Sequence, residues 1–105
     1  MDITVQPVGG GGDTTPPVTT GTFDRTTSKG KVYYDITLSA DEPATTHFRL
    51  TGQAHITAGG ADTTVWQVYT GPISIAVDKN GTANFDYYSV DIANNTEATH
   101  TEVLQ

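Results

Sequence analysis

The sequence predicts an all-β domain of the sandwich type, and three observations lead to that prediction. The chain has 105 residues, which is enough for one two-layer core. Apolar and polar residues alternate with a period of two in several short segments, and no segment of helical period is long enough to compete. Eleven glycines and five prolines divide these segments, so about seven short strands are expected. A small closed barrel has the same periodicity and stays the alternative fold.

The start of the chain is expected to be a linker, because residues 9–12 are an uninterrupted glycine run. Before this run, residues 3–6 (Ile-Thr-Val-Gln) have the composition of a strand. Residues 1–12 are therefore interpreted as a linker or the tail of a preceding module, and residues 13–105 as the domain. Appended or disordered residues would explain the start of the chain equally well.

The first two strands are expected at residues 18–23 and 32–40. Pro16 and Pro17 precede the first, and proline blocks ladder pairing at that point. In the second strand one face is apolar, which predicts that this face lies against the core, and its residues are Tyr34, Ile36, Leu38 and Ala40. Pro43 ends the strand because proline lacks the donor that a ladder needs.

The middle of the chain is less regular. Residues 45–50 are expected to form a strand whose inward residues are Thr46, Phe48 and Leu50 and whose outward residues are His47 and Arg49. Residues 52–64 are hard to assign and hold at most a short strand near His55. A strand at 65–69 follows and leads into a Thr-Gly-Pro turn.

The last three strands are expected at residues 73–77, 82–91 and 99–104. Between the first two of them, Asp78-Lys79-Asn80-Gly81 predicts a hairpin, because Asn-Gly accepts the positive φ angles of a type I′ turn. The long strand 82–91 is expected to turn Phe85, Tyr87 and Ser89 toward the core.

Composition limits the classes of function. The chain has no cysteine, which excludes disulfides, thiolate zinc sites and a cysteine nucleophile. The net charge is −7 and the five Lys and Arg residues form no basic patch, so no nucleic-acid partner is expected. No run of apolar residues is long enough for membrane insertion. The three histidines have no metal spacing and no neighbouring nucleophile, so neither an enzyme nor catalytic residues are expected.

Four short motifs occur in a fixed order: Asp-Thr-Thr-Pro-Pro at 13–17, Thr-Leu-Ser-Ala-Asp at 37–41, Trp-x-x-Tyr-Thr-Gly-Pro at 66–72 and Tyr-x-Ser-x-Asp-x-Ala-x-Asn-x-Glu at 87–97. With these motifs the chain resembles bacterial immunoglobulin-like modules, which are similar to fibronectin type III sandwiches. The resemblance implies an antiparallel sandwich without a disulfide, in tandem repeats of bacterial surface or secreted proteins or beside glycoside hydrolase domains. It also implies an extracellular or cell-surface location, with neighbouring domains of the same polypeptide as partners.

The chain departs from the family pattern at two places. Ala93-Asn94-Asn95 replaces an Ala-Gly-Asn turn, and asparagine tolerates the left-handed conformation well, so the turn is expected to survive. Residues 52–64 are an insertion before the tryptophan motif. Any new binding surface is expected there, because functional loops are carried by rigid scaffolds.

The leading functional expectation is a non-catalytic extracellular module that serves as a spacer or stalk. The alternative is an adhesion module that binds a carbohydrate or a host surface protein through the insertion and the aromatic residues Tyr33, Trp66 and Tyr88. Alternation turns Tyr33 and Tyr88 outward, whereas Trp66 and Tyr69 are expected to pack in the core or on a sheet surface. The two functions differ in whether Tyr33, Tyr88 and the insertion form one exposed flat patch.

Calcium is the one metal that the sequence brings into consideration, and no other cofactor is expected. Oxygen ligands in loops that a sandwich brings to one end are Asp41, Asp91, Asn95 and Glu97. In the favoured alternative, Asp91 and Asn95 hydrogen-bond their own turn, as Asx residues commonly do.

Overall fold

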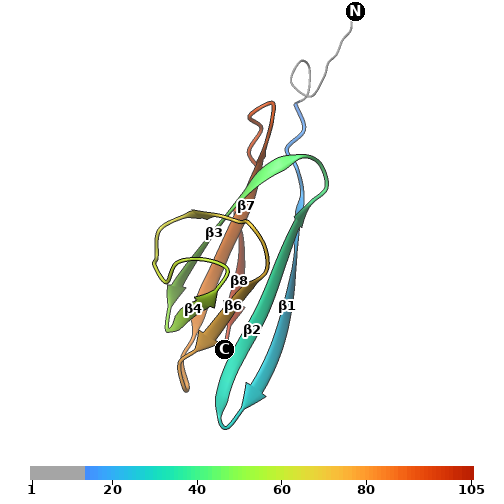
Figure 1. Ribbon diagram of the computed structural model, residues 1–105. Helices are drawn as coiled ribbons and strands as arrows, with labels where there is room; N and C mark the ends of the chain where they lie inside the picture. Colours follow the sequence, from blue (N-terminus) through green and yellow to red (C-terminus); the bar gives the residue numbers. More distant parts are fainter. Residues whose placement is uncertain (1–13) are drawn as a thin grey trace, which may run out of the picture.

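The computed structural model describes residues 14–105, which form two antiparallel four-stranded sheets packed face to face (Figure 1). The predicted all-β sandwich is therefore confirmed. The linker expected at residues 1–12 lies outside the described residues. Within residues 14–105, no helix is long and apolar enough to cross a membrane.

The two sheets are built from eight strands, against about seven expected. The first sheet has the order β1-β2-β6-β4, with β1 (Thr19–Ser28), β2 (Lys31–Ala40), β6 (Ile73–Val77) and β4 (Ala54–Ala58). The second has the order β5-β3-β7-β8, with β5 (Gln67–Val68), β3 (Ala44–Gly52), β7 (Ala83–Asp91) and β8 (His100–Leu104). Strand β1 is longer than expected and β5 is shorter, whereas residues 52–64 supply β4.

The tight hairpin of the fold lies between β1 and β2, and the one expected at residues 78–81 is wrong. Ser28 pairs with Lys31, and the two residues between them, Lys29 and Gly30, have φ angles of 52° and 82°, both positive as a type I′ turn requires. At residues 78–81 the chain does turn, but β6 already pairs with β2 on one side and β4 on the other. Because β6 has no free edge, β7 crosses to the second sheet.

The core lies between the sheets and is formed by the inward residues that alternation predicted. Ile36, Phe48, Ile73 and Phe85 are fully buried. Phe85 packs against Phe48 within its own sheet and against Phe23 of β1, with both ring centroids 5.7 Å away. Each such buried side chain contributes about 1.5–3 kcal/mol of hydrophobic stabilisation. The contact between Phe23 and Phe85 therefore joins the two sheets across the core.

The chain enters and leaves the sandwich at opposite ends (Figure 1). At the entry end, β1 begins beside the end of β2, where Thr19 pairs with Ala40. At the exit end, the backbone oxygen of Gln105 accepts hydrogen bonds from Arg25 Nε at 2.7 Å and from the Tyr34 hydroxyl at 3.1 Å. Strand β1 connects the two ends, and its ten residues span about 33 Å at about 3.3 Å per residue.

Candidate functional site

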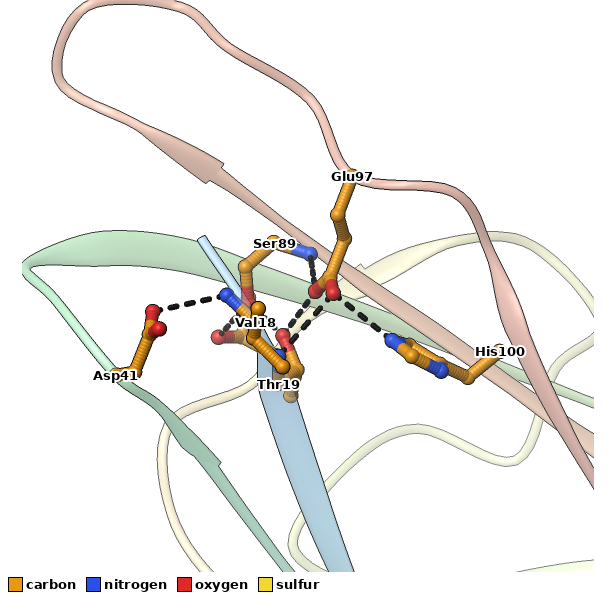
Figure 2. A network of polar contacts seen from close by, with 7 residues as sticks. Val18, Thr19, Asp41, Ser89, Glu97 and His100 are labelled. Carbon is orange, nitrogen blue, oxygen red and sulfur yellow. Dashed lines mark hydrogen bonds and ion pairs between the residues drawn. The ribbon is translucent and has the colours of Figure 1, made fainter. Parts of the chain in front are cut away.

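A buried polar cluster joins the two sheets at the entry end, and Figure 2 shows it from close by. We call it the entry clamp, and it consists of Thr19, Thr46, Ser89, Glu97 and His100. Thr19 belongs to the first sheet, whereas Thr46, Ser89 and His100 belong to three strands of the second. Thr19, Ser89 and Thr46 retain 3%, 0% and 9% of their exposure, so these hydroxyls require partners inside the protein.

The Glu97 carboxylate is the centre of the clamp. Its Oε1 accepts from the Thr19 backbone amide at 3.1 Å and contacts His100 Nε2 at 2.8 Å. Its Oε2 accepts from the Ser89 amide at 2.8 Å and from the Thr19 hydroxyl. The Ser89 hydroxyl extends the network to the hydroxyls of Thr19 at 2.6 Å and Thr46 at 2.7 Å. One side chain thus ties the first strand to the second sheet.

Burial and hydrogen bonding act in opposite directions on Glu97, whose side chain is 7% exposed. Burial by itself would raise the pKa of this carboxyl, because it disfavours the charged form. Hydrogen bonds from Thr19, His100 and Ser89 outweigh burial and hold the pKa below its usual value. Glu97 is therefore an ionised, fully engaged carboxylate at neutral pH.

The order of contacts in the clamp differs from that of a hydrolase triad. In a triad the histidine lies between the hydroxyl and the acid, so that it can remove the hydroxyl proton. Here Glu97 lies between the Thr19 hydroxyl and His100. The clamp therefore has the geometry of a structural tie.

The other residues considered for calcium are also held by hydrogen bonds at the entry end. Asp41 Oδ1 accepts from the Val18 amide at 2.8 Å. Asp91 accepts from the Asn95 amide at 2.8 Å and from its side-chain amide at 3.0 Å, which is the Asx turn of the favoured alternative. Asn94 has a φ of 68°, so the turn survives as predicted. Among residues 14–105, no group of three or more His, Asp or Glu side chains is arranged to hold a metal ion.

Two of the three aromatic residues predicted for binding come together on the outer face of the second sheet. Trp66 and Tyr88 meet edge to face with centroids 4.9 Å apart, and His47 stacks on Tyr88 at 5.0 Å. The Arg49 guanidinium lies 4.4 Å from the centre of the Trp66 ring. We call these four residues the aromatic cluster. Trp66 thus packs against neighbouring side chains on the sheet surface, as expected.

Tyr33 lies elsewhere. It is an outward residue of β2 in the first sheet, whereas Tyr88 is an outward residue of β7 in the second. The two tyrosines therefore face opposite sides of the sandwich. The single flat patch that the binding alternative required from Tyr33, Tyr88 and the insertion is not formed.

The insertion carries a second histidine–carboxylate cluster, which is exposed. His55 Nδ1 lies 3.0 Å from Asp62 Oδ2, and His55 Nε2 lies 3.2 Å from Asp78 Oδ1. Asp62 also accepts from the Ile56 amide at 3.1 Å. The hydrogen bond with Asp62, followed by the charges of Asp62 and Asp78, raises the pKa of His55 above its usual value of 6.5. This cluster fastens the loop after β4 to the β6–β7 turn.

The exit end contains a hollow of about 420 Å³. Its lining comes from the β1–β2 hairpin, the β6–β7 turn and the last residue, and the residues are Arg25, Gly30, Val32, Val77, Asp78, Asn80, Gly81, Thr82 and Gln105. Sequence reasoning missed both the hollow and the entry clamp. For the clamp a signal was present, because Thr46 and Ser89 are polar residues at inward positions and therefore require a buried partner.

Comparisons with known proteins give no relative. No protein-family model, no curated protein and no solved structure matches the chain. Functional reasoning therefore rests on the residues and the fold.

Proposed function

We propose that this chain is a non-catalytic, immunoglobulin-like module that serves as a spacer in a larger bacterial surface or secreted protein. Its partners are the neighbouring domains of the same polypeptide. The observation that carries the proposal is the entry and exit of the chain at opposite ends of the sandwich, with β1 tied to the second sheet near both ends. The extracellular location rests on the family resemblance of the four sequence motifs.

The order of the strands supports the immunoglobulin-like type. In constant-type immunoglobulin domains the sheets contain strands A-B-E-D and C-F-G. Taken in chain order and with β5 set aside, the strands of this protein have that arrangement, β1-β2-β6-β4 against β3-β7-β8. Strand β5 is an addition at the edge beside β3, and it follows the insertion.

The geometry suits a load applied between the two ends. Strand β1 pairs with β2 over its whole length, from Thr19–Ala40 to Ser28–Lys31. Ladder hydrogen bonds run perpendicular to the strands, so a pull along the strands loads many of them together. The entry clamp and the Arg25–Gln105 hydrogen bond connect β1 to the C-terminal part of the chain, where the opposite force is applied.

Force spectroscopy on the full chain tests this proposal, with handles attached near Thr14 and Gln105. A spacer is expected to unfold in one cooperative event that releases the length of residues 14–105. A low-force step that detaches β1 before the remainder unfolds would contradict the proposal. The control pulls the same protein from the β1–β2 turn and Gln105, where the bonds open one by one and the force should be lower.

Binding of a carbohydrate or host protein remains a second candidate, because Trp66 and Val68 are 36% and 53% exposed on the outer face of the second sheet. Trp66 is the only tryptophan of the chain, so its fluorescence reports on the aromatic cluster alone. A saturable change in emission with soluble glycans, lost in Tyr88→Ala, would support binding. Unchanged emission at millimolar glycan would remove carbohydrate as the ligand.

A further inference from the structure

The two ends of the module carry opposite charges. Four of the five basic residues of the chain lie in or beside the exit-end turns, namely Arg25, Lys29, Lys31 and Lys79. The fifth, Arg49, pairs with Asp86 on a sheet face. At the entry end the β2–β3 turn carries Asp41 and Glu42. The module is therefore polarised along its length although its net charge is −7.

The two ends also differ in shape. The exit end has the hollow of about 420 Å³, whose lining is mostly polar and includes both Arg25 and Asp78. The entry end carries exposed apolar side chains on two neighbouring segments, with Ile92 67% and Val18 55% exposed. The exit end is thus recessed and mostly polar, whereas the entry end carries exposed branched side chains.

From the opposite charges of the two ends we propose that copies of the module dock head to tail, with the entry end of one copy seated on the recessed exit end of another. The carboxylates of the β2–β3 turn face the lysines of the two exit-end turns. Complementary potentials of this kind speed association and fix its register. Because the two surfaces differ, the contact is heterologous and extends into a line. The inference rests on the proposed spacer function, and it makes a tandem array a stiff rod.

Amide NMR spectra of the full chain, recorded from micromolar to millimolar concentration, test the docking. Shifts are expected in the 29–31, 78–82 and 91–96 segments, and 0.5 M salt should suppress them by screening the charges. Unchanged spectra at millimolar concentration, or shifts centred on the aromatic cluster, would overturn the proposal. Neither result would affect the force experiment on a single copy, so the two proposals can fail separately.

Charge reversal sharpens the test. Glu42→Lys at the entry end should weaken association about tenfold. Asp24→Lys makes the same charge change at an exposed position in the middle of β1 and should have little effect. Association should return when Glu42→Lys is mixed with the exit-end variant Lys31→Glu/Lys79→Glu. Equal weakening by Glu42→Lys and Asp24→Lys, or no recovery in the mixture, would contradict head-to-tail docking.

Discussion

Two clusters of this protein use the same chemical groups in different surroundings. In the entry clamp, His100 contacts Glu97, whose side chain is 7% exposed. In the insertion, His55 contacts Asp62 and Asp78, and the three side chains are 60%, 52% and 49% exposed. Water competes for the exposed groups and screens their charges, whereas the Glu97 carboxylate is shielded from water even though His100 is 40% exposed. We therefore expect burial, more than the number of charges, to decide how much each cluster contributes to the stability of the fold.

The largest effect is expected from Glu97→Ala. The substitution leaves the Thr19 and Ser89 amides, the Thr19 hydroxyl and His100 without their partner, and it should lower the free energy of unfolding by about 3 kcal/mol. Urea denaturation measures this loss. The control, Glu102→Ala on exposed β8, should change stability by less than about 0.5 kcal/mol. Equal losses in the two variants would mean that the clamp is not the stronger tie.

A smaller loss is expected from Ser89→Ala, because only the hydroxyl that links Thr19 and Thr46 is removed. Both threonine hydroxyls lose a buried partner, so the free energy of unfolding should fall by about 2 kcal/mol. The matched control is Ser39→Ala on the exposed face of β2. A loss below about 0.5 kcal/mol at Ser89 would show that the hydroxyl network contributes little beyond the carboxylate.

Acid should weaken the clamp. The pKa of Glu97 lies below its usual value of 4.5 in the folded protein, so its contribution is fully present above pH 4.5 and is lost as pH falls through the folded pKa. Free energies of unfolding between about pH 3 and 7 measure this loss. Glu97→Gln has no such group to titrate and should show a flatter profile. Parallel profiles for the two proteins would assign the acid sensitivity to other carboxylates.

The smallest effect on stability is expected at the exposed cluster. Asp62→Asn should leave the urea midpoint of unfolding almost unchanged, because water already screens this exposed pair. It should nevertheless lower the pKa of His55, because Asp62 is the main cause of its elevation. The small stabilisation from His55 is present below pH 6.5 and is lost as pH rises through the folded pKa. NMR titration of the His55 ring measures this pKa, and an unchanged pKa of His55 in Asp62→Asn would contradict the prediction.

Alternation predicted the strands whose inward side chains fill the core, as in β2, β3 and β7. It failed for β1 beyond Phe23, because Arg25 and Thr27 occupy the inward side there and the apolar signal stops. The strand continues because β2 offers a ladder along its whole length, a contact that no local pattern reports.

The residues of a turn likewise predicted only part of the structure. Asn80 takes a positive φ of 57°, as an Asn-Gly signal indicates, but the strands on either side lie in different sheets. A turn residue reports the backbone angle and not the partner of the strand that follows. Predicting the entry clamp also required the strand topology, because Thr19 and Glu97 are 78 positions apart in sequence.

Amide hydrogen exchange at Thr19 and Ser89 tests the central claim most directly, because both amides donate to the Glu97 carboxylate. The account predicts that both amides are strongly protected in the native protein. In Glu97→Ala, Thr19 should lose its protection while amides near Ile36 keep theirs. Rapid exchange of the Thr19 amide in the unmodified protein would show that Glu97 does not tie β1 to the second sheet.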